Sequence, residues 1–212
     1  MSLFLTFITS LMLGMRHATD PDHIVAVTTI VSRERSVVKA AGIGAVWGVG
    51  HTITLLVVGG AIIAFKVAVN ARLGLSMELC VAVMLIVLGV LNLFDVRTTS
   101  NGPKASRPFF VGVVHGLAGS AAAALLIVPL IDDPRWAALY LFTFGLGTIV
   151  GMTIITLTIA APSLLATTHM PSLQRSLRLA SGAVSLVFGL YLAHKIGFAD
   201  GLFTSNARWT PE

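Results

Sequence analysis

Long apolar segments alternate with short polar stretches along the whole chain. A helix needs about 20 mostly apolar residues to cross a bilayer. Six segments reach that length: Leu3–Val31, Ala40–Phe65, Met77–Val96, Phe109–Ile131, Trp136–Leu165 and Leu177–Phe198. The longest and most polar connection, Arg97–Pro108, divides them into two sets of three. The pattern predicts an all-α integral membrane protein with six transmembrane helices.

One polar cluster interrupts the first apolar segment, where the sequence reads RHATDPDHI at Arg16–Ile24. The ring of Pro21 clashes with the carbonyl of His17 and removes a backbone hydrogen bond. The order Asp20, Pro21, Asp22 is typical of a helix N-cap, a first helical residue and an acid in the first turn. We therefore predict that the first span is broken near Pro21 into two half-helices.

The residue types in this cluster are those of a metal site. Ionisable groups at bilayer depth are expensive and are functional candidates by default. Two imidazoles with one or two carboxylates suit nickel, cobalt or zinc better than iron or manganese. The break at Pro21 lets His17, Asp22 and His23 converge on one ion, with Asp20 beside them. The alternative is a structural network in which Arg16 neutralises the aspartates.

The two halves of the chain resemble each other at three places, each offset by 97 to 100 residues. The matched pairs are GMRHA with GVVHG (Gly14–Ala18 and Gly112–Gly116), WGVGHT with FGLGTI (Trp47–Thr52 and Phe144–Ile149), and LGVLNL with FGLYLA (Leu88–Leu93 and Phe188–Ala193). A repeat of three helices must be inverted in the membrane, which is typical of secondary transporters. We predict one transmembrane domain over residues 1–212, with repeat 1 at about 1–97 and repeat 2 at about 108–200.

Further candidates lie outside the first span. His51, in the second span, is flanked by Gly48 and Gly50, which permit close helix approach, and is expected to be a ligand or gate. His115 is the repeat partner of His17 and is expected to face the same cavity. Ser120 is expected to serve helix packing.

Charge predicts the orientation of the chain. The first, third and fifth connections carry eight lysine and arginine residues, against five in the other connections and the C-terminal tail. Cytoplasmic loops are enriched in these residues. We therefore expect a multi-pass protein of the cell (inner) membrane with both termini outside the cytoplasm.

Composition excludes other classes. The chain is 56% hydrophobic and only 11% charged, whereas soluble domains carry about 25% charged residues. The composition therefore predicts a membrane domain and leaves no room for a soluble one. The net charge of +5 lies in short loops and indicates no nucleic-acid partner. A thiol–disulfide carrier needs two cysteines, and Cys80 is alone. An intramembrane hydrolase would carry H-E-x-x-H or G-x-S-x-G, and neither motif is present, so no enzyme is predicted.

RHATDPDHI followed by GVGHT resembles the nickel/cobalt permease (NiCoT) family, whose signature is close to RHAxDADHI. In that family the histidines and aspartate of this motif recognise the metal, which implies roles for His17, Asp22 and His23. Proline replaces the usual alanine at Pro21. HGLAGSA at His115–Ala121 and the six-span length are more similar to the urease-accessory-type (UreH-like) transmembrane proteins grouped near that family.

These observations predict a permease for a divalent transition-metal ion, nickel or cobalt, working in uptake, with the ion as transported substrate and no permanently bound cofactor. Efflux by the same architecture is the first alternative, and an intramembrane metal-dependent hydrolase is the second. The expected partners are the ion and the lipid bilayer, with cytoplasmic nickel chaperones or a second copy of the chain left open. Because histidine binds metal as neutral imidazole, binding should weaken as the pH falls through about 6.5.

Overall fold

The computed structural model describes residues 3–32, 34, 36–65, 69–95, 106–127, 133–166 and 171–209. Within these residues the regular structure is entirely helical. The α-helices are α1 (Leu3–His17), α2 (Pro21–Val31), α3 (Val37–Thr54), α4 (Gly60–Phe65), α5 (Ala71–Leu93), α6 (Ser106–Ile127), α7 (Pro134–Ala166) and α8 (Pro171–His194). A π-helical segment, Leu55–Gly59, joins α3 to α4, and another, Lys195–Ala199, continues α8. The all-α prediction is thus confirmed.

Four helical segments of the described chain are long and apolar enough to cross a membrane: Val37–Phe65, Ala71–Leu93, Arg135–Ala161 and Gln174–Ala199. Large apolar side chains on their outer surfaces are exposed, as at Val57 and Val187. An exposed apolar belt on long apolar helices is what a lipid environment requires. The chain is therefore a membrane protein.

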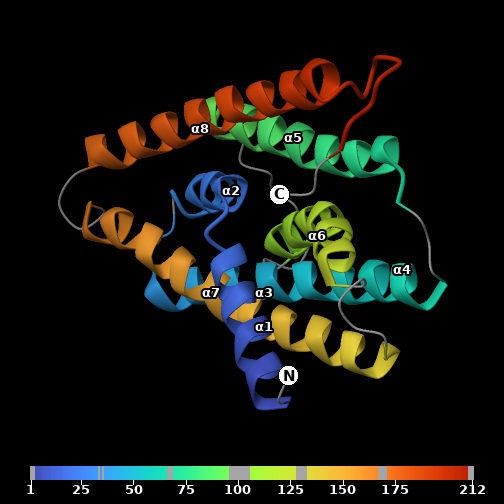
Figure 1. Ribbon diagram of the computed structural model, residues 1–212. Coiled ribbons are helices and arrows are strands. Elements are labelled where there is room, and N and C mark those ends of the chain that lie inside the picture. The colour runs from blue at the N-terminus through green and yellow to red at the C-terminus, as the bar shows by residue number, and fades with distance from the viewer. Residues whose placement is uncertain are drawn as a thin grey trace.

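The helices form layers (Figure 1). Helices α5 and α8 pack against each other on one side of the molecule, and α3 packs against α7 on the other. Helices α2 and α6 lie between these pairs: α2 contacts α5, α7 and α8, and α6 contacts α3 and α5. The largest hydrophobic core lies here and includes Val27, Trp47, Leu85 and Met152.

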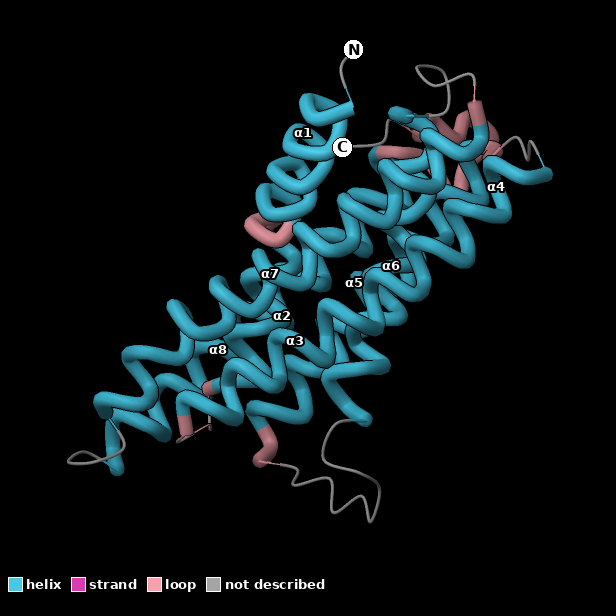
Figure 2. Tube along the Cα trace, turned by 90° about the horizontal axis from the view of Figure 1, so that it is seen from below, coloured by secondary structure: helices cyan, strands magenta, loops and turns pink. Residues whose placement is uncertain are grey.

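The first span is broken where the proline predicts it. Helix α1 ends at His17 and α2 begins at Pro21, with 15 and 11 residues respectively. Neither half reaches the length that one span needs alone. Figure 2 shows α1 diverging from the other helices, with the short non-helical stretch at its end.

Asp20 departs in one respect from the N-cap role that the sequence predicts. Its backbone is extended (φ −61°, ψ 144°), and its carbonyl accepts the N–H of Ile24, as at a helix start. Its carboxylate makes no capping hydrogen bond. Instead, Oδ2 lies 2.7 Å from Nδ1 of His17. The side chain is thus directed to the histidine, and the cap is made by the backbone and Pro21.

The far end of α2 is attached to α5 and α8 through Asn92. The Nδ2 atom of this buried side chain lies 3.3 Å from the carbonyl oxygen of Thr29, 3.2 Å from Oγ of Ser32 and 3.0 Å from Oγ of Ser181. Arg178 donates from Nη1 to the carbonyl of Asn92 at 2.8 Å, at the C-terminal end of α5. A single amide therefore fixes α2 at the end opposite the Asp22–His23 pair.

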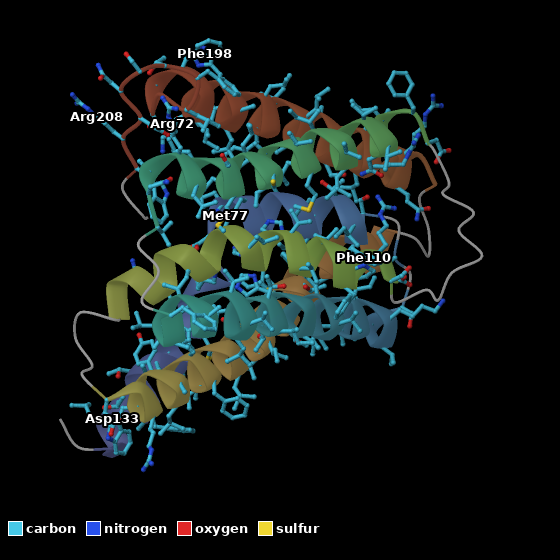
Figure 3. The ribbon with its side chains drawn as sticks, turned by 90° about the vertical axis from the view of Figure 1, so that its right-hand side faces the viewer. Arg72, Met77, Phe110, Asp133, Phe198 and Arg208 are labelled. Carbon is cyan, nitrogen blue, oxygen red and sulfur yellow. The ribbon has the colours of Figure 1, made fainter. Side chains whose placement is uncertain are left out.

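The ends of the bundle are seen in Figure 3. Arg72, Arg208 and Asp133 lie toward one end, and Phe110 lies toward the other. The C-terminal segment packs back on α5, where Trp209 donates from Nε1 to Oε1 of Glu78 at 2.7 Å. This arrangement puts the start of α5, the start of α7 and the C-terminal segment on the same side of the molecule.

Candidate metal centre

Four histidines from four helices meet in the middle of the protein. His17 ends α1, His23 lies in the first turn of α2, His51 lies near the end of α3, and His115 lies in α6. The ring centroids of His23 and His115 are 4.7 Å apart, and those of His17 and His23 are 4.8 Å apart. The ring of His51 lies 5.1 Å from that of His17 and 5.5 Å from that of His23. The break between α1 and α2 brings His17 and His23 together, since each ends or begins a half-helix.

Three of these side chains have the spacing of a ligand set. One ring nitrogen each from His17, His23 and His51 lies within 4.8 Å of the others. A metal–imidazole bond is about 2.0–2.1 Å long, so two ligating nitrogens lie up to about 4 Å apart. Small side-chain rotations would bring all three nitrogens onto one ion.

Asp22 links the cluster to the second half of the chain. Its Oδ1 lies 3.4 Å from Nδ1 of His23, and its Oδ2 lies 3.7 Å from Nε2 of His115. The backbone N–H of His23 also donates to Oδ1 at 2.9 Å, which fixes the carboxylate. Asp20, Asp22 and His23 form a second group with metal-ligand spacing that shares His23 with the first.

Several buried ring nitrogens of the cluster make no hydrogen bond within the described part of the chain. Among the described residues these are Nε2 of His17, both ring nitrogens of His23, both ring nitrogens of His51, Nε2 of His115 and Nε1 of Trp47. An unsatisfied buried polar atom costs about 1–3 kcal/mol. The buried imidazole nitrogens among them, which converge from several helices, are therefore suited to a cation that takes their lone pairs.

His115 is oriented by the backbone. Its Nδ1 lies 3.2 Å from the carbonyl oxygen of Val111, one turn earlier in α6. The carbonyl can only accept, so Nδ1 carries the proton and Nε2 keeps its lone pair. Metal-ligating histidines are commonly held in this way, through the ring nitrogen that does not bind the metal.

Two aromatic rings that the sequence analysis did not assign to the site lie against the histidines. Trp47 lies 5.5 Å from both His23 and His115, measured between ring centroids. Phe144 of α7 lies 5.5 Å from His17. A signal for Trp47 was present, because it stands four residues before His51 and therefore on the same face of α3.

The glycines of α3 permit the close helix contacts that the sequence predicts. A Cβ at Gly48 would lie 2.8 Å from Cα of Ile149 in α7, and one at Gly50 would overlap the carbonyl oxygen of Phe109 in α6. Both positions therefore require glycine. Ser120 lies in α6, but its side chain is outside the described part of the chain.

In the described part of the chain, Arg16 does not pair with the aspartates, contrary to what the alternative of a structural network predicts. Its side chain is exposed, and among the described residues no ion pair joins it to Asp20 or Asp22. Its carbonyl oxygen accepts the backbone N–H of Thr19 at 2.8 Å. The aspartates face histidines instead, which favours the metal interpretation of the cluster.

Fold and site together define a helical membrane protein with a buried histidine–aspartate cluster. The chain is 31% identical over 209 residues to the urease accessory protein UreH of Bacillus sp. (strain TB-90), an alignment that covers 90% of this chain and 91% of that protein. The chain belongs to the UreH-like family near the nickel/cobalt transporters, and the resemblance stated from the sequence is confirmed.

A more distant relative is the chloroplast protein FOR GROWTH AND FERTILITY 2 of Arabidopsis thaliana. It is 25% identical over 202 residues, which cover 86% of this chain and 54% of that protein. No family model matches the chain, and no solved structure matches it.

Proposed function

We propose that the protein is a secondary transporter that carries a divalent transition-metal ion, nickel or cobalt, across the cell membrane into the cytoplasm. The observation that carries this proposal is the convergence of His17, His23, His51 and His115 on Asp22 inside a helical membrane protein. The name of its Bacillus relative, a urease accessory protein, is consistent with metal supply to an enzyme rather than catalysis by the chain itself.

The proposal includes an inverted repeat of three helices. Matching helix contacts in the two halves support it. A Cβ at Gly14 would overlap the carbonyl oxygen of Phe144, and one at Gly112 would overlap the carbonyl oxygen of Trp47. Gly14 corresponds to Gly112 in the repeat, and Trp47 corresponds to Phe144. The first helix of each half therefore meets the second helix of the other half at equivalent residues.

The α5–α8 pair gives the same support. A Cβ at Gly89 would lie 2.6 Å from the backbone nitrogen of Leu186, and one at Gly189 would lie 2.8 Å from the backbone nitrogen of Ile86. Gly89 corresponds to Gly189 and Ile86 to Leu186, and each pair is 100 residues apart in the sequence. A contact in which i meets j and j meets i is the mark of two-fold symmetry. Two related halves around a central site can rock against each other and expose it to either side in turn.

Exposure suggests the path of the ion. The side chain of Asp20 is 45% exposed and that of His17 is 20% exposed, whereas His51 is fully buried. We infer that a hydrated ion meets Asp20 first, because carboxylates attract it, and then exchanges waters for His17, His23 and His51. Asp22 and, from the other half, His115 complete the coordination. Release requires α2 to move relative to α5 and α8, where Asn92 now holds it.

The membrane potential can drive uptake without ATP. Moving one charge across 100 mV releases about 2.3 kcal/mol, so a divalent cation gains about 4.6 kcal/mol on entering a negative interior. The excess of lysine and arginine in the odd-numbered connections supports an orientation with both termini outside. Efflux through the same architecture is the competing direction.

Flux in proteoliposomes tests the proposal. The purified chain is reconstituted, and uptake of radiolabelled nickel, cobalt and zinc is compared under an imposed inside-negative potential and without one. Nickel or cobalt should accumulate faster than zinc, and faster with the potential than without it. His17→Ala should abolish this uptake. Wild-type accumulation by His17→Ala, or no flux of any metal through the wild-type protein, contradicts the proposal.

A further inference from the structure

The indole of Trp47 is enclosed by the metal centre. The residue is 0% exposed and lies in α3, one helical turn before His51. Its ring faces His23 of α2 and His115 of α6, each with a centroid separation of 5.5 Å. Trp47 therefore contacts the candidate ligands from both halves of the chain.

Its N–H group has no partner among the described residues. An indole nitrogen donates a hydrogen bond but has no lone pair for a metal. A buried donor without an acceptor costs about 1–3 kcal/mol, and buried tryptophans ordinarily find a partner. Trp209 shows the ordinary case, since its Nε1 donates to Oε1 of Glu78 at 2.7 Å. A ligand that enters the centre beside the indole can supply the missing acceptor.

The ring is held in place by α6. A Cβ at Gly112 would lie 2.9 Å from Cδ1 of Trp47, the carbon bonded to the indole nitrogen. It would also overlap the carbonyl oxygen of Trp47. With backbone on one side and histidine rings on the other, the indole cannot swing away to reach another acceptor.

The corresponding ring in the second half cannot make the same interaction. Phe144, which matches Trp47 in the repeat, lies 5.5 Å from His17 and has no polar atom. Both halves therefore place an aromatic ring against a histidine, but only Trp47 adds a hydrogen-bond donor. The hydrogen-bond donor is therefore supplied by the first half of the chain and not by the matching residue of the second half.

We propose that Trp47 is a substrate-positioning residue whose indole N–H donates to a water molecule retained by the bound divalent ion. The inference rests on the proposed function. One lone pair of that water binds the ion, and the other accepts from Nε1 of Trp47. Together with His115 and Asp22, the nitrogens of His17, His23 and His51 make five ligands available, which leaves one position for water on an ion that binds six. A water bridge of this kind is nearly as favourable as a direct contact.

This arrangement contributes to selectivity. An ion that binds six ligands keeps its water and gains the hydrogen bond from Trp47. An ion that is satisfied by four protein ligands in a tetrahedral shell, as zinc commonly is, loses the water and leaves the N–H unsatisfied. Trp47 therefore favours nickel and cobalt over zinc.

Ultraviolet resonance Raman spectroscopy of the purified full chain, with and without nickel chloride, tests this role. The indole N–H bending band shifts when the group begins to donate a hydrogen bond. Nickel should shift this band in the wild-type protein and in Trp209→Phe, a matched control whose deleted indole already has a partner. The shift should be absent in Trp47→Phe. Nickel that binds without any change in the wild-type band overturns the role of Trp47.

Affinity gives a second readout. Trp47→Phe should bind nickel roughly tenfold more weakly, as expected for loss of one hydrogen bond, and should lose part of its preference for nickel over zinc. Unchanged affinity and preference overturn the inference. If Trp47→Phe does not fold, a shift that persists in both Trp209→Phe and Trp136→Phe still assigns the band to Trp47, and loss of the shift in Trp136→Phe overturns the inference. Failure of the wild-type protein to bind nickel at all contradicts the proposed function itself, and so is distinguished from failure of this inference.

Discussion

Oδ2 of Asp22 and Nε2 of His115 lie 3.7 Å apart, although 93 residues separate them in the chain. Asp22 belongs to the first half and His115 to the second. Nε2 of His115 is held toward the centre because Nδ1 of the same ring is engaged by Val111. This pair places residues of both halves in the candidate metal centre, as the proposed alternating access requires.

Replacing Asp22 by asparagine tests the electrostatic part of that pair. The substitution keeps the size of the side chain but removes the negative charge that faces His23 and His115. We expect Asp22→Asn to bind nickel on the order of 10- to 100-fold more weakly, the range seen when groups supporting a metal site are removed. Calorimetric titration of the detergent-solubilised protein measures the change. Asp133→Asn, at an exposed residue toward one end of the bundle, is the control and should bind as the wild type does.

His51 is the most deeply buried of the candidate ligands, and its loss should be severe. We expect His51→Ala to reduce nickel affinity at least on the order of 100-fold while the protein stays folded, because the deletion removes a ligand and also two unsatisfied buried nitrogens. Equilibrium dialysis with nickel and circular dichroism of the same samples separate binding from folding. His194→Ala removes an exposed histidine at the end of α8 and should leave affinity unchanged. Equal affinities for the two variants would exclude His51 as a ligand.

Nickel affinity should depend on pH with a definite sign. Histidine coordinates a metal only as neutral imidazole, so protons compete with the ion. The ordinary pKa of imidazole is about 6.5, and affinity should therefore be highest above neutral pH and fall as the solution becomes more acidic. If several histidines bind the ion, as we propose, the fall should be steeper than one proton per ion. Titrations of the detergent-solubilised protein on both sides of that pKa measure the slope, and a flat profile would argue against histidine ligands.

The glycine contacts predict paired effects on stability. Gly14→Ala and Gly112→Ala each place a methyl group against a carbonyl oxygen of the facing helix, Phe144 in the first case and Trp47 in the second. Overpacking of this kind costs about 1–3 kcal/mol. Both variants should lower the thermal unfolding midpoint in detergent by similar amounts. Gly42→Ala meets no atom within 4 Å and should be neutral or slightly stabilising. A large effect in only one member of the pair would contradict the inverted repeat.

Much of the fold follows from local chemistry that the sequence displays. The six apolar segments correspond to α1–α2, α3–α4, α5, α6, α7 and α8, and among the described residues those of α3–α4, α5, α7 and α8 are long and apolar enough to be candidate spans. Pro21 predicts the break because a proline ring has a definite steric effect on the preceding turn. The carboxylate of Asp20 was harder to place, since a cap and an ion pair are both local options. The structure selects the contact with His17 at 2.7 Å.

The parts of the site that the sequence did not predict depend on packing between helices. From the sequence, Trp47 is only an apolar residue in a membrane-spanning segment. The packing of α2 and α6 brings it against His23 and His115. The π-helical segment Leu55–Gly59, just after His51, likewise cannot be predicted from an uninterrupted apolar sequence. Such segments are frequent at functional sites because they disturb the regular backbone pairing. Asn92 joins three helices through hydrogen bonds to groups 60 or more residues away.

X-ray absorption at the nickel K edge of the purified, nickel-loaded protein tests the central claim most directly, because it reports the atoms bound to the ion. The multiple-scattering pattern of at least three imidazole rings is expected, with oxygen in the remaining positions, and it should weaken in His17→Ala and His51→Ala. A spectrum with oxygen neighbours only, unchanged in those variants, would contradict a histidine-bound substrate at this centre.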